Sequence, residues 1–287
     1  MLKKIKHIIE YSIFLYFLAI FKFLPFKISS HFGGLVVETL AIWLKANRIA
    51  KKNLKDIYPD LSKKRINLIT KQIWNNLGRN IAEFPHITNM KKDEILDLVE
   101  IKNLKILDKY KNKAVLFVTA HYSNWEIANI LLHHLGFKMN TIYRVANNNF
   151  IDKKIKEMRS EGKNINLFKK GKKESGRFLL NILKKQAGGM LIDQKYGEGI
   201  DIKFLGKEAK TSSFVANIAK KYEINIVPVC VKRQANKKYE LIIEDPITKD
   251  FTKNKSELEI MLELNKIIES WINNDPSQWF WVHNRWS

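Results

Sequence analysis

The sequence predicts an α/β fold in which a mixed β-sheet is flanked by helices, with a hydrophobic helical membrane element at the N-terminus. Short apolar runs alternate with amphipathic segments from residue 114 onward. Strands separated by helices of about 10–15 residues are typical of such a sandwich. The chain has 287 residues, of which 45% are hydrophobic, so it can bury a sizeable core. No internal repeat or long linker divides it, and one large domain is expected.

The N-terminal element consists of two apolar stretches, Ile8–Leu24 and Phe32–Leu44. The longest uncharged part of the first, Tyr11–Phe21, is short for a bilayer span. No small-residue cleavage site follows it, so we expect the segment to be retained. A run of basic residues between 45 and 55 suits an anionic cytoplasmic leaflet. Residues 1–45 are therefore predicted to anchor the chain in a membrane, as a short span or deep anchor in preference to an interfacial helix. Two ordinary core helices are the soluble alternative.

Residues 46–287 are expected to form the α/β domain. From Leu61 onward, apolar residues recur at spacings of three and four, which predicts a long amphipathic helix. The strand candidates are Ala114–Thr119, Lys138–Tyr143, Gly189–Asp193, Asp201–Phe204, Asn225–Val231 and Tyr239–Ile243. The helix candidates between and after them are Asn124–Leu135, Phe150–Glu161, Lys173–Lys185, Ser212–Tyr222 and Ser256–Asn273.

The charge balance indicates polyanionic partners. With 51 Lys and Arg against 29 Asp and Glu, the formal net charge is +22, which favours nucleic acid, anionic lipid or an acidic carrier protein. Arg contributes only eight of the basic residues, so part of the charge is a solvated Lys surface. No zinc finger, RNA-binding aromatic motif or recognition helix is evident, and we expect no nucleic acid partner.

Cysteine and histidine usage argues against disulfides and metal sites. Cys230 is the single cysteine and lies in an apolar run. It has no partner for a disulfide or a Cys-based metal site, which favours a reducing, cytoplasm-facing location. The seven histidines show no metal-binding spacing, so we expect no metal.

The most informative motif joins the first predicted strand to the helix after it. Val115–Val118 is an apolar run that leads to His121, with Glu126 five positions on. On one continuous helix these two side chains would lie about 140° apart. A helix that begins at Ser123 or Asn124 leaves His121 in the turn, and Glu126 can then reach its ring. A neutral imidazole held in one tautomer by a carboxylate is a general base for an alcohol.

The same residues have a structural alternative. Ser123-x-x-Glu126 is also a capping box, in which the Ser123 side chain binds the Glu126 amide and Glu126 binds the Ser123 amide. Capping boxes are commoner than catalytic pairs. Further blocks along the chain favour the catalytic interpretation.

These blocks occur in the order of a known family. They are Arg48–Leu54 with Tyr58 and Pro59, Leu77–Phe84, His121 with Glu126, Tyr143 and Arg144 with Asn147–Asn149 and Arg159, Asp193–Gly197 with Phe204 and Gly206, and Pro276–Arg285. Together they span nearly the whole chain. The chain resembles the bacterial lipid A secondary acyltransferases, the lauroyl and myristoyl transferase family, within the wider acyltransferase group marked by His-x4-Asp/Glu. It departs from the family pattern at Val145, where Pro is common, and at Lys195, where an acidic residue is common.

The resemblance implies an acyltransferase-like sandwich and transfer of a fatty acyl chain from acyl carrier protein to the hydroxyl of a 3-hydroxyacyl chain on a Kdo-bearing lipid A precursor, in lipopolysaccharide biosynthesis. It implies no cofactor, and it implies acyl carrier protein, the lipid A precursor and anionic inner-membrane lipids as partners. The location it implies is the cytoplasmic face of the inner membrane. Two alternatives stay open: an acyltransferase acting on a glycerophospholipid or another glycolipid, and a non-catalytic basic membrane-associated binding protein.

Under this resemblance His121 is the base and Glu126 orients it. The oxyanion or substrate-binding candidates are Arg144, Arg159, Asn124, Asp193 and Gln194. A thioester transfer develops negative charge on the carbonyl oxygen, and Arg144 follows a strand expected beside the His121 strand, which makes it the oxyanion candidate. Arg159 is a candidate for an acceptor phosphate. Asp193 and Gln194 lie at the carboxyl end of a predicted strand, where open α/β sheets bind ligands. A surface arginine, a solvated helix face and a turn leading to Gly197 are the respective alternatives.

The acyl chain requires an apolar groove that begins next to His121, because each buried methylene is worth roughly 0.8 kcal/mol. Ile127, Ile130 and Leu131 follow the catalytic block and are the groove candidates. Ordinary packing of the helix on the sheet is the alternative for each. The C-terminal aromatic residues are interpreted as core packing with interfacial anchoring.

Overall fold

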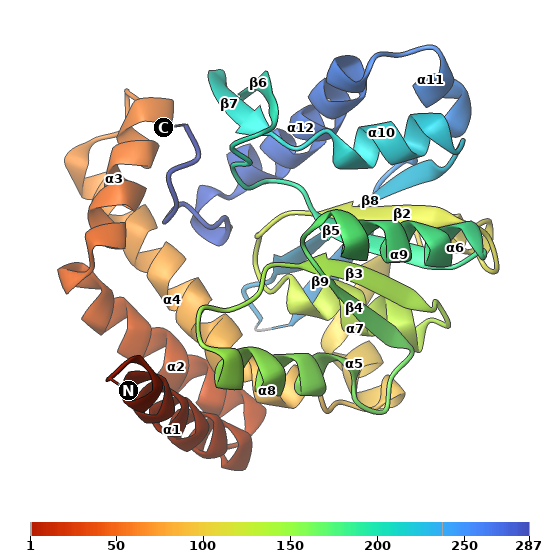
Figure 1. Ribbon diagram of the computed structural model, residues 1–287. Coiled ribbons are helices and arrows are strands. Elements are labelled where there is room, and N and C mark those ends of the chain that lie inside the picture. Colours follow the sequence, from red (N-terminus) through yellow and green to blue (C-terminus); the bar gives the residue numbers. More distant parts are fainter. Residues whose placement is uncertain (1, 237, 287) are drawn as a thin grey trace.

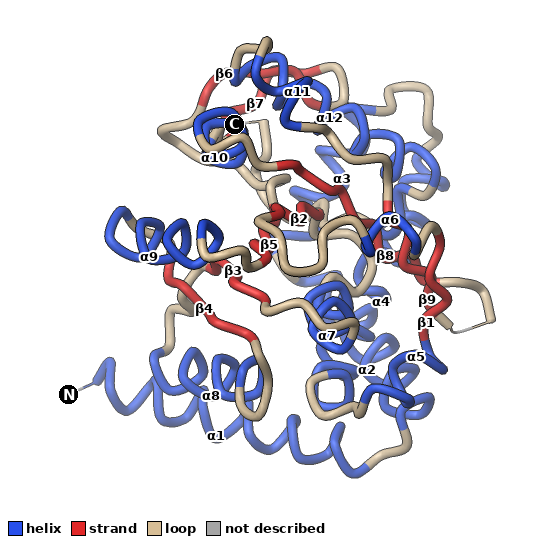
Figure 2. Tube along the Cα trace, turned by 90° about the vertical axis from the view of Figure 1, so that its right-hand side faces the viewer, coloured by secondary structure: helices blue, strands red, loops and turns tan. Residues whose placement is uncertain are grey.

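The computed structural model describes residues 2–236 and 238–286, and its centre is a seven-stranded mixed sheet (Figures 1 and 2). The strand order is β1 (Val99–Lys102), β9 (Tyr239–Ile243), β8 (Asn225–Arg233), β2 (Val115–Thr119), β5 (Ala187–Leu191), β3 (Met139–Tyr143) and β4 (Ile165–Lys169). The pair β8 and β9 is antiparallel and every other neighbouring pair is parallel. A separate antiparallel hairpin joins β6 (Ile200–Phe204) to β7 (Lys207–Thr211). The predicted α/β class with a mixed sheet is confirmed.

Strand β2 lies in the middle of the sheet because it is apolar on both faces. All five of its residues are buried, as expected for a parallel strand covered by helices on each side. Leu116 and Val118 belong to one core, and Val115 and Phe117 to the other. Since side chains alternate along a strand, each face of the sheet has its own hydrophobic core.

The helices divide between the two faces (Figure 2). The core on one face includes residues of α3 (Lys45–Ile57), α4 (Lys63–Ile87), α9 (Lys172–Leu183), α10 (Phe214–Lys221) and α12 (Glu257–Asn274). The core on the other face includes residues of α5 (Lys92–Leu98), α6 (Lys105–Asp108) and α7 (Glu126–His134). The chain also forms helix α8 (Asn149–Ser160), helix α11 (Lys249–Lys253) and the short 3-10 helices η1 (Ala41–Trp43) and η2 (Pro276–Gln278).

The six predicted strands and the predicted helices are all present, with ends shifted by a few residues. The largest strand shift is at β5, which begins and ends two residues before the predicted Gly189–Asp193. Strands β1, β4 and β7 were not predicted. Each is short and carries charged or polar residues in place of a continuous apolar run.

The N-terminal residues form α1 (Leu2–Phe23) and α2 (Phe26–Leu40), and α2 packs closely on α4. A Cβ added at Gly78 of α4 would lie 2.2 Å from the Gly33 carbonyl oxygen of α2. The hydroxyl group of Ser30 also donates a hydrogen bond to Glu83 Oε1, at 2.6 Å. Helix α2 therefore shares a tight interface with the α/β domain, while the predicted division at residue 45 stays a prediction.

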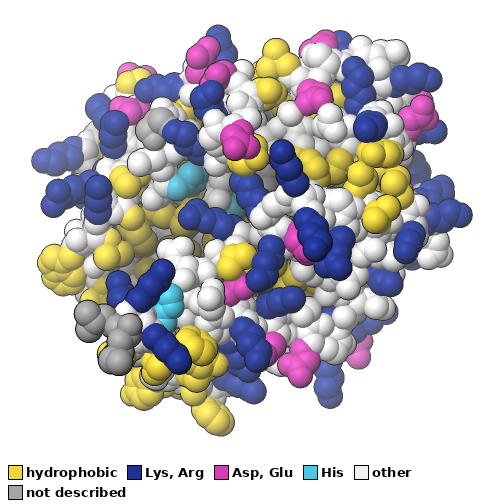
Figure 3. All heavy atoms as spheres, in the orientation of Figure 1, with side chains coloured by type: hydrophobic (Ala, Val, Ile, Leu, Met, Phe, Trp, Pro, Cys, Tyr) yellow, Lys and Arg dark blue, Asp and Glu magenta, His cyan; other side chains and the backbone are white. Residues whose placement is uncertain are grey.

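Exposed apolar side chains concentrate on the N-terminal segment. Among the described residues, fifteen of the 23 exposed large hydrophobic side chains lie before residue 45. Figure 3 shows hydrophobic side chains gathered at the lower left, on the side where Figure 1 places α1 and α2. Within residues 2–236 and 238–286, no helix combines the length and apolarity needed to cross a membrane, so the short span considered from the sequence is not found.

Candidate active site

The carboxyl ends of β2 and β5 bring His121 and Asp193 together. The two strands are neighbouring and parallel, so the chain leaves both at the same edge of the sheet. His121 lies two residues after β2, and Asp193 lies two residues after β5. The His121 Nδ1 atom is 2.8 Å from Asp193 Oδ1, and the His121 backbone N–H donates to Oδ2 at 2.9 Å. Asp193 thus holds both the ring and the backbone of His121.

The surroundings of Asp193 keep it ionised. Its side chain is fully buried, and the Trp279 indole N–H donates to Oδ2 at 2.7 Å. Burial by itself would raise the pKa of the Asp193 carboxyl, but the His121 ring and its hydrogen bonds outweigh burial and hold that pKa well below its usual range. The ionised carboxylate accepts a hydrogen bond from Nδ1–H of His121, which leaves Nε2 as the basic nitrogen. The Gln194 amide nitrogen lies 3.3 Å from Nε2 and can donate to it.

The prediction that Glu126 hydrogen-bonds to the His121 ring is wrong. Both ring nitrogens of His121 have other neighbours, and the Glu126 carboxylate forms a bidentate ion pair with Arg159. The Arg159 Nε to Glu126 Oε2 distance is 2.9 Å. Glu126 is the first residue of α7, and the charged partner it meets there comes from α8.

The predicted capping box is also absent. Ser123 adopts a left-handed backbone with φ of 50°, and its N–H donates to the Gln278 carbonyl oxygen at 2.7 Å. The Glu126 N–H is capped instead by the Asn124 side-chain oxygen at 3.3 Å. The helix therefore begins later than either Ser123 or Asn124, because the turn after His121 is held by residues distant in sequence.

Arg144 and Arg159 do not occupy the predicted positions. Arg144 follows β3, and β5 lies between β3 and β2, so the expected neighbouring strands are not neighbours. Its side chain is exposed, and within the described residues no hydrogen bond or ion pair joins it to His121. Burial lowers the pKa of the Arg159 guanidinium, but Glu126 outweighs this and raises it. Arg159 is therefore a partly buried partner of Glu126, and its guanidinium is already paired with that carboxylate instead of a phosphate.

Asn124 belongs to a buried polar network centred on Glu83, which the sequence analysis did not single out. Asn124 Nδ2 donates to Glu83 Oε2 at 2.7 Å, and Arg233 donates to both Glu83 oxygens at 2.6 and 3.1 Å. The Tyr239 hydroxyl group is a further donor. Burial would raise the pKa of the Glu83 carboxyl, but Arg233 and these hydrogen bonds lower it. Two signals pointed to Glu83: it is a carboxylate inside an apolar helical pattern, and it lies in the Leu77–Phe84 block of the family resemblance.

The space beside His121 is small in this structure. A cavity of about 10 Å³ is lined by Ile73, Asn76, Leu77, Asn80, His121, Trp125, Gln278, Trp279 and Phe280. The groove candidates Ile127, Ile130 and Leu131 do not line it. All three are fully buried between α7 and the sheet, so the packing alternative holds for them.

The described residues contain no group of three or more His, Cys, Asp or Glu side chains placed to hold a metal ion. Cys230 is buried, and burial raises the pKa of its thiol, which makes it a poor nucleophile. A buried carboxylate that orients a histidine, with no cysteine or serine hydrogen-bonded to that histidine's ring among the described residues, is an arrangement suited to general-base chemistry.

An α/β sheet with a histidine base at the carboxyl end of its central strand is an architecture suited to an acyltransferase, and comparison with known proteins agrees. The model of the bacterial lipid A biosynthesis acyltransferase family matches residues 1–287, and the chain belongs to that family. Two lipid A biosynthesis acyltransferases from Haemophilus influenzae are each 22% identical to it. One alignment covers 93% of this chain and 84% of the relative, and the other 91% and 85%.

Among solved structures, the chain is similar to the 1-acyl-sn-glycerophosphate (LPA) acyltransferase, PlsC, from Thermotoga maritima. The identity is 13% and the TM-score 0.40, over 96% of this chain and 99% of that one. The suspected family is confirmed by the family model, and with it an enzyme that transfers acyl groups in lipid A synthesis.

Proposed function

We propose that this enzyme transfers a fatty acyl chain from acyl carrier protein to the hydroxyl of a 3-hydroxyacyl chain on a Kdo-bearing lipid A precursor. The observation that carries the chemistry is the His121–Asp193 pair, with Nε2 of His121 left as the base. The family supplies the substrate class. No cofactor is needed, because the thioester donor is already activated.

The proposed reaction is a direct transfer. His121 Nε2 takes the proton of the acceptor hydroxyl while its oxygen attacks the thioester carbon. Asp193 holds the ring in the Nδ1–H tautomer and stabilises the imidazolium that forms. When the tetrahedral intermediate collapses, the carbon–sulfur bond breaks and the departing thiolate takes the proton from His121. No acyl-enzyme is required, since within residues 2–236 and 238–286 no Ser or Cys forms a hydrogen bond with the His121 ring.

Gln194 replaces Arg144 as the proposed oxyanion donor. Its amide nitrogen is 3.3 Å from His121 Nε2, so the acceptor hydroxyl displaces a long hydrogen bond when it binds. The released amide N–H then lies next to the reacting carbon, where negative charge develops. Arg144 is exposed and is left with the surface role that the sequence analysis kept as its alternative.

The basic and apolar surfaces suit the proposed partners. A net charge of +22 favours acidic carrier protein, the phosphates of the lipid A precursor and anionic inner-membrane lipids. The exposed apolar side chains before residue 45 favour binding at the cytoplasmic face of the inner membrane. With no helix apolar and long enough to span, among those described, we propose that α1 and α2 bind in the plane of the interface.

Purified protein tests the proposal directly. Incubation with acyl carrier protein charged with one fatty acid and with a Kdo-bearing lipid A precursor should add one acyl mass to the precursor. Lysophosphatidic acid offered in place of the precursor should stay unchanged. Acylation of the lysophospholipid but not of the lipid A precursor would refute the proposed acceptor.

A further inference from the structure

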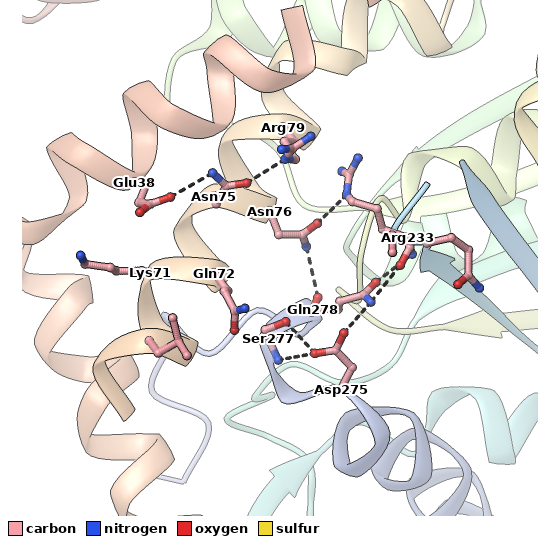
Figure 4. Close-up of a pocket in the computed structure, with 13 residues that line it drawn as sticks. Glu38, Lys71, Gln72, Asn75, Asn76, Arg79, Arg233, Asp275, Ser277 and Gln278 are labelled. Carbon is pink, nitrogen blue, oxygen red and sulfur yellow. Dashed lines mark hydrogen bonds between the residues drawn. The ribbon is translucent and has the colours of Figure 1, made fainter. Parts of the chain in front are cut away.

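A second, larger cavity adjoins the one that contains His121. Its volume is about 490 Å³, within the range of about 300–1,000 Å³ that is common for ligand sites. It lies between α2, α4, the residues after β8 and η2 (Figure 4). Asn76 and Gln278 line both cavities, so these two side chains stand between this larger space and the catalytic histidine.

Most residues that line this cavity have polar or charged side chains, and their carbon stems form much of its surface. Its walls are formed by Glu38, Leu68, Lys71, Gln72, Asn75, Asn76, Arg79, Arg233, Gln234, Ala235, Asp275, Ser277 and Gln278. Leu68 and Ala235 are the only apolar members. Eleven of the thirteen side chains end in polar or charged groups that a hydrocarbon would leave without hydrogen-bond partners, so the cavity suits a polar ligand better than an acyl chain.

Among the described residues, the Arg79 guanidinium has no carboxylate within ion-pair distance. Its Nε donates to Asn75 Oδ1 at 2.7 Å and its Nη1 donates to the Ser30 hydroxyl oxygen at 3.2 Å. Within the described part of the chain, no carboxylate oxygen lies within 4.0 Å of its guanidinium, whereas the nearby Arg233 is paired with Glu83. Burial and then Arg233 lower the pKa of Arg79. A bound anion would supply the missing counter-charge.

The neighbouring groups extend this site along α4. Lys71, Asn75 and Arg79 recur every four residues, so they lie on one side of the helix. Figure 4 shows the hydrogen-bonded row from Glu38 through Asn75 to Arg79 along the cavity wall. Lys71 is exposed at its edge. Cations beside carboxylate and amide acceptors can bind a phosphate and its adjoining hydroxyl groups.

We propose that this cavity binds the phosphorylated, hydroxyl-rich headgroup of the acyl acceptor, with Arg79 and Lys71, about 12 Å apart along α4, on phosphate groups at different points of the headgroup and Glu38 and Gln72 on hydroxyl groups. This inference rests on the proposed acyl transfer. The headgroup lies in the larger cavity, and a chain attached to it passes Asn76 and Gln278 so that its hydroxyl reaches His121. The acceptor would thus be positioned by its headgroup.

Kinetics with paired acceptors test the inference. Lys71→Gln and Arg79→Gln should each raise KM for a phosphorylated lipid A precursor by about 10-fold or more, the range for a lost hydrogen bond to a charged group. kcat at saturating acceptor and KM for the acyl donor should change little. With the same precursor after enzymatic removal of its phosphates, variants and wild type should have equal KM.

Lys64→Gln is the matched control. Lys64 is exposed on the same face of α4, seven residues or about 10 Å before Lys71, and does not line the cavity. If wild type acylates the precursor and both cavity variants keep the KM of Lys64→Gln, the headgroup site is refuted while the acyl transfer stands. If wild type acylates no lipid A precursor, the proposed function itself fails. Lys71 is exposed, so Lys71→Gln tests the site even where Arg79→Gln does not fold.

Discussion

Replacing Asp193 with asparagine changes the chemistry of the catalytic pair while nearly preserving its shape. Asp193 accepts three hydrogen bonds: Oδ2 from the His121 backbone N–H at 2.9 Å and the Trp279 indole N–H at 2.7 Å, and Oδ1 from His121 Nδ1 at 2.8 Å. Asparagine offers one oxygen and one NH₂ group. One of these positions must therefore receive a donor.

The two orientations of the asparagine amide differ in cost. With its NH₂ group at the Oδ2 position, two N–H donors would face a third donor in a buried site. With its oxygen there, both of those hydrogen bonds survive and the NH₂ group faces His121 Nδ1 alone. The second orientation costs less, and it requires an unprotonated Nδ1. The proton then moves to Nε2, and His121 can no longer accept a proton from the acceptor.

We therefore expect Asp193→Asn to lower kcat by roughly 10²–10⁴-fold, the range for losing a general base, with little loss of fold. Acyl transfer gives kcat, and nitrogen NMR of His121 gives the tautomer. Glu126→Gln is the matched control, because it also replaces a hydrogen-bonded, partly buried carboxylate by an amide but leaves the His121 ring untouched. It should lower kcat less and keep the Nδ1–H tautomer. A larger loss for Glu126→Gln, or an unchanged tautomer in Asp193→Asn, would refute this reasoning.

Three further outcomes are expected. Gly78→Ala should lower the unfolding midpoint, because its Cβ would lie 2.2 Å from the Gly33 carbonyl oxygen. Gly176→Ala in α9 is the control: its Cβ meets nothing within 4 Å, so this change should stabilise the protein by up to about 1 kcal/mol. Equal shifts of the midpoint in the two variants would contradict the close α2–α4 contact. Burial lowers the pKa of His283 to about 4, so the unfolded chain binds its proton more readily and stability should fall by at most about 3 kcal/mol as the pH drops from about 6.5 to 4. His283→Gln should remove that part of the slope in denaturant titrations at several pH values, and an unchanged slope would exclude it. Transfer from acyl carrier protein should fall with added salt more steeply than transfer from a small uncharged thioester, because salt screens exposed charges over about 8–10 Å; equal salt dependence would remove the role of the basic surface.

Local patterns were sufficient to predict most of the fold. The strands β2, β8 and β9 coincide with mainly apolar segments that end at charged or turn-forming residues, so the sequence pattern was sufficient to locate them. Strands β1 and β4 were not predicted from the sequence because they lie at the two edges of the sheet and are less apolar. Their position depends on a partner strand and not on their own sequence, and a single sequence does not reveal strand order.

The same limit explains the errors at the site. His121 could be predicted because it closely follows an apolar strand, and Asp193 because it closely follows another. That Asp193 and not Glu126 orients the ring follows from β5 lying beside β2, which no spacing in the sequence indicates. The prediction that Arg144 lies beside His121 was wrong for the same reason, since β5 separates the Arg144 strand from β2.

The N-terminal helices are linked to the turn that carries His121 through two sets of contacts. Ser30 of α2 donates to Glu83, which accepts from Asn124, three residues beyond His121. Helix α1 contacts α8, the helix that carries Arg159, where Tyr11 stacks on Phe150 with ring centroids 5.7 Å apart. A segment that rests on a membrane through its exposed apolar side would therefore hold the base at a fixed depth relative to the lipid surface. Under the proposed function, in which one substrate stays in the bilayer and the other arrives on a soluble carrier, such an arrangement would place the base within reach of both.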